Sequence, residues 1–170
     1  YLAAGGLLDP TIGGLSVAAA SKRRGMYMQI KRAQIDYLLT TFDAPNTTQS
    51  CPKRERSNTP LQALTLMNDK LFVQSAQALA QRSLGDAPDD FGSRIGRIFG
   101  FAVAHPPSQE DVADLAELFQ RVRATYKMDP ERAERTAGEG KAGNRSTADV
   151  AAWVVLARVV LNLDEVITRE

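Results

Sequence analysis

The chain has 170 residues, 44% of them hydrophobic and 24% charged, so it can bury a core without help from disulfides or metals. Its 21 basic and 20 acidic residues leave a net charge of +1, which by itself supports neither a nucleic-acid-binding protein nor one attracted to an anionic membrane. A single cysteine and a single histidine exclude an internal disulfide and any site built from several cysteines or histidines. We therefore expect no metal and no cofactor in this chain.

The chain gives no sign of a membrane span or of a signal peptide. No apolar run reaches the ~18 residues needed to cross a bilayer. Residues 1–4 lack the basic flank and long apolar segment of a signal peptide, and the chain begins with tyrosine rather than methionine. We expect a piece of a longer polypeptide, so the missing signal says nothing about where the parent protein resides.

The first part of the chain is expected to form an irregular arm. Residues 1–21 are rich in glycine and alanine, with turn residues at Asp9–Pro10 and Gly13–Gly14. Residues 26–30 alternate large apolar side chains with others, which is the period of a half-buried strand. We assign residues 1–32 to this arm, with one short extended segment near residues 25–31, and residues 33–170 to a single helical domain.

The remainder predicts an all-α bundle of five to six helices. Thr59–Pro60 is a strong helix start, because threonine can accept bonds from the first free amide groups and proline has no amide proton to leave unsatisfied. Ser108 with Asp111 resembles a capping box, and Asp129 precedes another proline. Thr147 or Asp149 is expected to open the last helix.

Apolar side chains recur at helical spacing in each of these segments. In the helix after Thr59 the predicted apolar stripe consists of Leu61, Leu64 and Met67. In the last helix Trp153 is expected to anchor the middle of the core. Short connections between such helices favour antiparallel neighbours.

The loop before Thr59 carries the candidate for an anion site. Arg54 and Arg56 could clamp a carboxylate or a phosphate, and the free amides and positive dipole end at the helix start would add to the attraction. The interpretation we favour is structural, in which these arginines tie the loop to acids such as Asp43, Asp69 or Asp164–Glu165.

A second basic cluster lies near the arm. Five basic residues fall within residues 22–32 with Tyr27 and Met28 between them, a pattern that can hold phosphates or single-stranded nucleic acid. We favour a solvated edge, where charges prevent unwanted strand pairing, over nucleic-acid binding. The five residues are Lys22, Arg23, Arg24, Lys31 and Arg32.

The lone cysteine and histidine are not expected to form a catalytic pair. Cys51 could be activated by nearby cations but would need a base, and His105 is followed by two prolines at a helix exit. We expect an inert thiol at Cys51 and a helix C-cap at His105. The acids Asp164 and Glu165 fall where the last helix should end, so one of them needs a cationic partner or the helix breaks at Asn162 and restarts.

The order of these motifs resembles the planctomycete-specific domain family, a domain family of unknown function, and the chain is similar to its C-terminal part. The residues that carry the resemblance are Leu8–Gly14, Arg23–Tyr27, Leu39–Pro45, Cys51–Asp69 and Asn162–Glu165. The resemblance implies large secreted, periplasmic or cell-envelope proteins, many with a planctomycete-type cytochrome c domain ahead of this one. Any haem would belong to that separate domain, and no catalytic residue is implied.

We therefore expect a non-catalytic helical module that packs against other domains of the same parent polypeptide. The alternative is a binding or catalytic site for an anionic or sugar-derived ligand around Arg54, Arg56 and Thr59. A weaker alternative is nucleic-acid binding through Lys22–Arg32. The ligand-binding candidates are Asp43, Arg54, Arg56, Asn58, Gln62, Asn68, Asn162 and Asp164.

Overall fold

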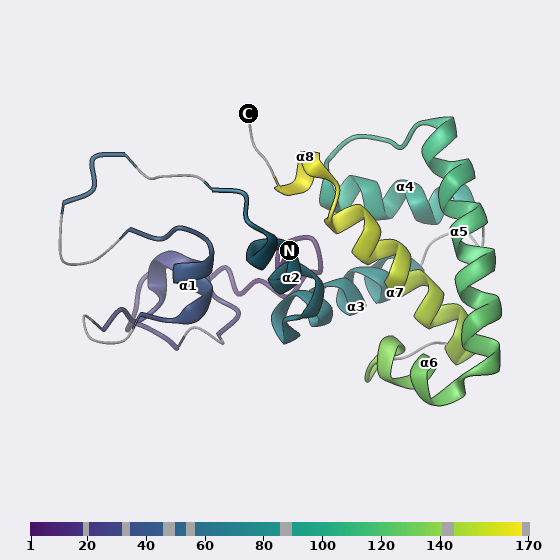
Figure 1. The fold of residues 1–170 in the computed structure, drawn as a ribbon, viewed down its shortest axis with the longest axis horizontal. Helices are drawn as coiled ribbons and strands as arrows, with labels where there is room; N and C mark the ends of the chain where they lie inside the picture. Colours follow the sequence, from purple (N-terminus) through teal and green to yellow (C-terminus); the bar gives the residue numbers. More distant parts are fainter. Residues whose placement is uncertain are drawn as a thin grey trace.

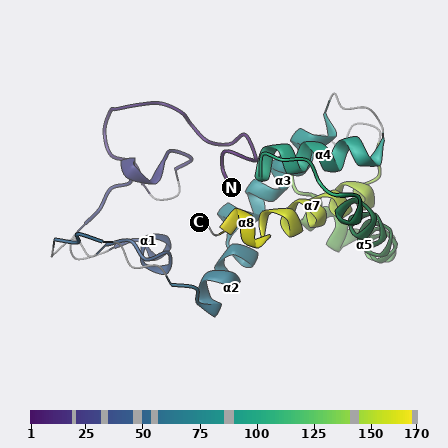
Figure 2. The same ribbon diagram turned by 90° about the horizontal axis from the view of Figure 1, so that it is seen from above.

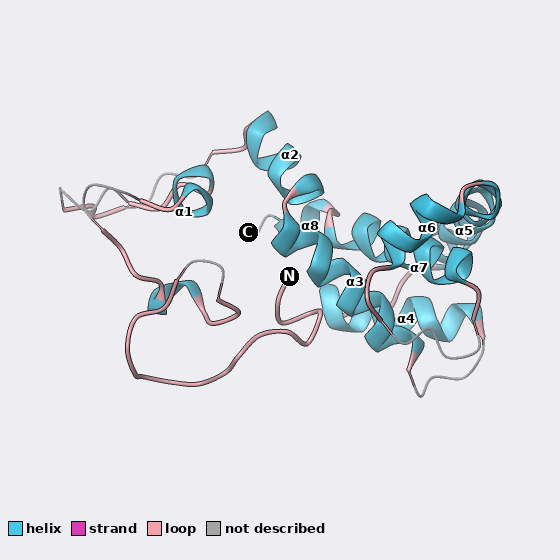
Figure 3. Cartoon of the chain, turned by 90° about the horizontal axis from the view of Figure 1, so that it is seen from below, coloured by secondary structure: helices cyan, strands magenta, loops and turns pink. Residues whose placement is uncertain are grey.

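The computed structural model describes residues 1–18, 21–31, 35–45, 50–53, 57–85, 90–140 and 145–167. Within these ranges the chain forms α-helices and one short 3-10 helix with no strand, which confirms the all-α prediction (Figures 1 and 3). None of the helices in these ranges is long and apolar enough to span a bilayer.

Six of the helices have two or more turns, and two are single turns. The longer ones are α2 (Pro60–Asn68), α3 (Lys70–Leu84), α4 (Phe91–Ala102), α5 (Gln109–Met128), α6 (Pro130–Ala137) and α7 (Thr147–Leu161). The single turns are α1 (Tyr37–Thr41) and α8 (Asp164–Ile167), and the 3-10 helix is Gly25–Tyr27.

The predicted helix starts are confirmed by their caps. The Thr59 hydroxyl accepts from the amide of Gln62 while the Gln62 side chain accepts from the amide of Thr59, a complete capping box at α2. Ser108 and Asp111 make the same reciprocal pair at α5, and Asp129 caps α6. The last long helix begins at Thr147 as predicted, with Ser146 as its cap.

The core lies around α7, which α3, α4, α5 and α6 surround (Figure 1). Trp153 of α7 is 2% exposed and packs against Phe91 and Phe119, which confirms its predicted place in the core. Because α7 contacts partners on several sides, most of its residues are apolar, and ten of its fifteen residues are buried.

The described residues between Asp9 and α2, which include α1, form a lobe beside the bundle, to the left in Figure 1 and again separate in the turned view of Figure 2, while the N-terminus lies against the bundle. Where a half-buried strand was expected, Gly25–Tyr27 forms a 3-10 turn, and Met28 makes only an isolated bridge to Val17. The amides of Tyr27 and Met28 bond within turns, while the carbonyl of Tyr27 and the amide of Gln29 pair with Val17. The arm is nevertheless attached to the bundle, since the hydroxyl of Tyr1 donates to the carbonyl of Leu161 at 2.7 Å.

Helix α2 connects the lobe to the bundle. Its predicted apolar stripe faces solvent, because Leu61, Leu64 and Met67 are 61%, 57% and 51% exposed. The residues that α2 buries are Gln62 and Leu66. The helix therefore presents three large apolar side chains to solvent and turns a polar one inward.

Candidate functional site

Two of the predicted site residues, Asp43 and Gln62, meet in a hydrogen-bonded cluster with Ser57. Asp43 follows α1 with φ of 56°, in the left-handed region that aspartate adopts more readily than most residues. Its carboxylate accepts from the amide of Ser57 at 2.8 Å, from the hydroxyl of Ser57 at 2.7 Å and from Nε2 of Gln62 at 3.1 Å. This Asp43–Ser57–Gln62 cluster fixes the end of α1 against the start of α2.

Gln62 is the centre of the cluster and is 8% exposed. Its Oε1 accepts from the amide of Thr59, and its Nε2 also lies 2.9 Å from the carbonyl of Thr41. A buried amide group is stabilising only when both its ends have partners, and here they do. The cluster consists of groups that satisfy one another, which suits a tie between chain segments better than a site prepared for a reaction.

The asparagines among the candidates are not brought to this cluster by any hydrogen bond within the described residues. Asn68 donates to the carbonyl of Leu64 within α2, and Asn162 donates to the carbonyl of Arg158 at the end of α7. Asn58 is exposed just ahead of the α2 cap. Two of the three asparagines therefore serve helix ends, as their residue type favours.

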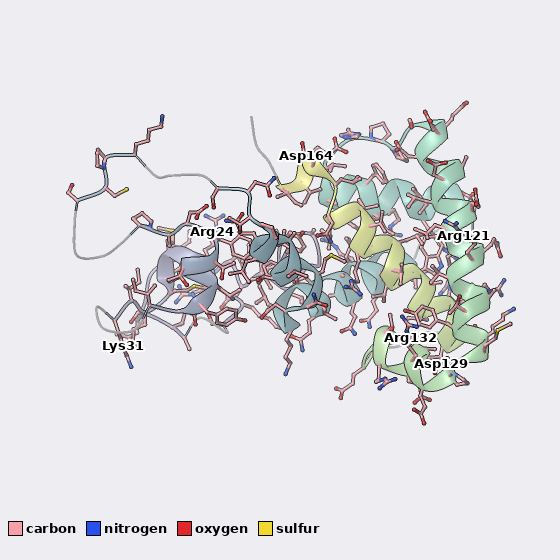
Figure 4. The ribbon with its side chains drawn as sticks, viewed as in Figure 1. Arg24, Lys31, Arg121, Asp129, Arg132 and Asp164 are labelled. Atoms are coloured by element: carbon pink, nitrogen blue, oxygen red, sulfur yellow. The ribbon has the colours of Figure 1, made fainter. Side chains whose placement is uncertain are left out.

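Asp164 is the first residue of α8 and is exposed; Figure 4 labels it at the end of the bundle. Arg54 and Arg56 lie outside the described residues, so the predicted anion site and the predicted ties of these arginines to acids stay predictions. The described part of that site is the hydroxyl of Thr59, which is already engaged by the amide of Gln62 at 3.2 Å.

Other side chains, not predicted from the sequence, hold the junction between α2 and α3. The hydroxyl of Tyr37 donates to the carboxylate of Asp69, and this bond is the main cause that raises the pKa of Tyr37 to about 12. Arg158 of α7 donates to the carbonyl of Met67 at the end of α2. The only sequence signal for this second tie was an arginine that interrupts the apolar run of the last helix.

Arg82 also connects distant segments through backbone carbonyls. Arg82 of α3 donates to the carbonyl of Ala4 at 3.0 Å and lies 3.7 Å from the ring of Phe101. A guanidinium has five donors, so it can hold a carbonyl and still face an aromatic ring. The arm is therefore attached to α3 by a residue that the sequence analysis did not single out.

The basic cluster near the arm is partly used inside the arm itself. Arg23 donates to the carbonyls of Thr11, Gly13 and Leu15, and its guanidinium lies 4.1 Å from the ring of Tyr27. The aromatic ring that could have stacked on a base is thus covered by an arginine. Lys22, Arg24 and Lys31 are exposed, with the last two labelled in Figure 4, and Arg32 lies outside the described residues.

Cys51 and His105 have separate surroundings. The exposed thiol of Cys51 donates to the carbonyl of Lys53 at 3.1 Å. His105 lies beyond the end of α4, so it is not the C-cap, and its Nε2 lies 2.9 Å from the carboxylate of Glu165. The predicted break of the last helix at Asn162 is confirmed, since α7 ends there and α8 begins at Asp164. Glu165 has His105 as its partner, which is a cation when its ring is protonated.

Comparison with known proteins adds one finding. Residues 1–119 match the family model described as PSD1: Protein of unknown function (DUF1553). No curated protein and no solved structure matches the chain.

Proposed function

The chain belongs to the PSD1 family of proteins of unknown function (DUF1553), and we propose that it is a non-catalytic helical module of a larger secreted or cell-envelope protein. In this proposal the module packs against another domain of the same polypeptide. The envelope location, the planctomycete context and a haem-carrying cytochrome domain elsewhere in the parent protein rest on the resemblance of the sequence motifs.

The observation that carries the proposal is the apolar stripe on α2. Leu61, Leu64 and Met67 lie three residues apart, all more than half exposed, on a helix whose other face is already packed. Exposed apolar side chains that are contiguous mark interaction surfaces more often than isolated ones do. Fully burying one such side chain stabilises a contact by about 1.5–3 kcal/mol. Three of them can therefore stabilise the contact with a neighbouring domain.

The polar motifs support the same role. Asp43, Ser57 and Gln62 bond to one another, and Asn68 and Asn162 bond to carbonyls of their own helices. These residues stabilise the helix ends that hold α2 in position.

The test compares one double substitution in two settings. Leu61→Ser with Leu64→Ser is introduced into this chain alone and into the parent polypeptide, and thermal unfolding is measured in both. In the isolated chain the two substitutions should change the free energy of unfolding by no more than about 0.5 kcal/mol, since the side chains are exposed. In the parent polypeptide they should lower the melting temperature and expose the junction with the neighbouring domain to proteolysis.

Met128→Ser is the matched control, because Met128 is 87% exposed at the end of α5, away from the stripe. Equal effects of the double substitution in both settings would contradict the proposal. So would self-association of the chain that disappears with the double substitution, because the stripe would then pair two copies rather than two domains.

A further inference from the structure

The lobe beside the bundle exposes large apolar side chains to solvent. Of the four most exposed ones among the described residues, three lie in the lobe: Leu15 is 90% exposed, Ile12 87% and Met26 78%. Ile30, also more than half exposed, follows Met26 on the same segment. Single exposed apolar residues are ordinary, but several on one small lobe indicate an interaction surface.

These side chains lie on two loops that are bound to each other. The guanidinium of Arg23, on the second loop, donates to three carbonyls of the first, those of Thr11, Gly13 and Leu15. The amide of Gly13 in turn donates to the hydroxyl of Tyr27 at 3.1 Å. The first loop thus directs backbone polar groups toward the second loop and leaves its apolar side chains outside.

The same loops are basic, although the whole chain has a net charge of only +1. Between positions 9 and 31 the sequence holds one acid, Asp9, and four basic residues, which are Lys22, Arg23, Arg24 and Lys31. The carboxylate of Asp9 already accepts from the amide and the hydroxyl of Thr11, at 2.9 Å and 2.6 Å. Lys22, Arg24 and Lys31 are exposed, and the last two lie apart from each other across the lobe (Figure 4).

We propose that the lobe binds the surface of an anionic lipid bilayer, with its apolar side chains among the headgroups and its lysines and arginines at the phosphates. Ile12, Leu15 and Met26 leave water in this arrangement, which is favourable. Carbonyls taken out of water without a partner would oppose it, but three of them are already bound by Arg23. The inference does not depend on the domain contact proposed for α2.

Two observations favour a lipid surface over other partners. A single-stranded nucleic acid would stack its bases on an aromatic ring, yet the ring of Tyr27 has the guanidinium of Arg23 at 4.1 Å. A protein partner would need acids placed opposite cations that lie apart across the lobe. An anionic bilayer presents negative charge over its whole surface, so it meets them without such placement.

Cosedimentation of the full chain with lipid vesicles tests the proposal. One set of vesicles contains equal parts of phosphatidylglycerol and phosphatidylcholine, and the other contains phosphatidylcholine alone. The chain should bind the anionic vesicles saturably and at least roughly tenfold more strongly than the neutral ones, since each cation near an anionic surface strengthens binding about fivefold. High salt should weaken the binding.

Leu15→Ser tests the apolar contribution, and Met128→Ser is its matched control. Met128 is 87% exposed, nearly as much as Leu15, but it lies at the end of α5 in the bundle. Leu15→Ser should weaken binding to anionic vesicles roughly tenfold, because one large apolar side chain no longer enters the bilayer. Met128→Ser should bind as the original chain does, and both variants should keep the original melting temperature.

Lys22→Gln with Lys31→Gln tests the charges, and Arg121→Gln with Lys127→Gln removes the same charge from the exposed side of α5. The lobe variant should bind anionic vesicles roughly tenfold more weakly or worse, with a smaller dependence on salt. The α5 variant should bind as the original chain does, because it changes the net charge but not the lobe. Equal losses in the two variants would overturn the proposal.

Other results would assign the surface to a different partner and so overturn the proposal. Equal binding of Leu15→Ser and Met128→Ser would mean that the apolar side chains do not enter the bilayer. Self-association of the chain that Leu15→Ser abolishes would assign the surface to a second copy. A parent polypeptide that fails to bind the vesicles would show that another of its domains covers the lobe. Absence of binding to either set of vesicles would overturn the proposal outright.

Discussion

At the residue scale, Gln62 is the side chain outside the core whose removal should lower the free energy of unfolding most. Gln62→Ala would remove the acceptor of the Thr59 amide and the donor to Thr41, Asp43 and Ser57. Leaving such partly buried groups without partners costs about 1–3 kcal/mol. Urea unfolding should show a loss of this size, accompanied by faster amide exchange at the start of α2.

Gln120→Ala is the appropriate comparison, because Gln120 is an exposed glutamine on α5. It should change stability by no more than about 0.5 kcal/mol. If both alanine variants behaved alike, the Asp43–Ser57–Gln62 cluster would not be a stabilising tie.

His105 gives the chain a pH dependence that can be followed at one residue. The bond to the carbonyl of Pro106, and next the bond to Glu165, raise the pKa of His105 above its ordinary value of 6.5. The folded state thus favours the protonated ring. The resulting stability is fully present below pH 6.5 and is lost as the pH rises through the raised pKa of the folded state.

Because His105 is the only histidine, NMR titration of its ring measures this pKa without overlap. Glu165→Gln should lower the pKa only part of the way, since the carbonyl of Pro106 remains, and should flatten the pH dependence of melting. Glu117→Gln, an exposed change on α5, should do neither. A native pKa at or below 6.5 would contradict the assignment.

Among the candidate site residues, the sequence predicted local partners better than distant ones. The pairing of Thr59 with Gln62 spans three residues and follows from residue type and spacing. The contact of Gln62 with Asp43 joins residues nineteen positions apart and depends on how the intervening loop returns, which no local pattern specifies. Both residues were named from the sequence as candidate ligand contacts, and the structure shows them in contact with each other.

At the element scale, the helix starts could be predicted and the buried faces only in part. Caps at Thr59, Ser108 and Asp129 depend on the first turn alone, so the sequence contains what determines them. Which face of α2 is buried depends on what packs against it. The spacing of Leu61, Leu64 and Met67 described an apolar face correctly, yet no described element covers that face.

Two glycines on different helices lead to opposite predictions. Gly138 ends α6 with φ of 71° and ψ of −173°, a region essentially restricted to glycine, where another residue costs about 1–3 kcal/mol. A Cβ there would also lie 2.7 Å from the side chain of Gln77. Gly138→Ala should therefore lower the free energy of unfolding by about that amount.

Gly100, by contrast, is exposed inside α4, and a Cβ there would meet nothing within 4 Å. Gly100→Ala should raise the free energy of unfolding by about 0.5–1 kcal/mol, because alanine loses less backbone freedom in a helix. Chemical denaturation of the two variants distinguishes the effects by sign. A stabilising Gly138→Ala would show that the end of α6 is not held in this conformation.

At the scale of the whole molecule, stability is concentrated in the bundle. Of the described residues in the range 1–58, Ala4 is the only buried hydrophobic one, whereas the main core cluster draws its side chains chiefly from α3, α4, α5 and α7. The lobe is attached to the bundle by hydrogen bonds of Tyr1 and Arg82 and by ring contacts of Tyr1 and Phe42 with Phe72. Segments with few buried apolar contacts open at lower free energy than the core, so the lobe should exchange its amides well before α7 does.

The difference in stability between the bundle and the lobe can be tested by shortening one central side chain of the core. Leu156 of α7 is 0% exposed within the main core, and Leu156→Ala should cost about 2–5 kcal/mol through lost burial and the cavity it leaves. Val159→Ala on the same helix, at a position 39% exposed, should cost less than about 1 kcal/mol.

Amide exchange measured on both variants should show Leu156→Ala accelerating exchange in α3, α5 and α7 while the exchange of the lobe stays unchanged. Equal acceleration in the lobe would mean that arm and bundle unfold as one unit, because the hydrogen bonds of Tyr1 and Arg82 would then couple them as strongly as a shared core.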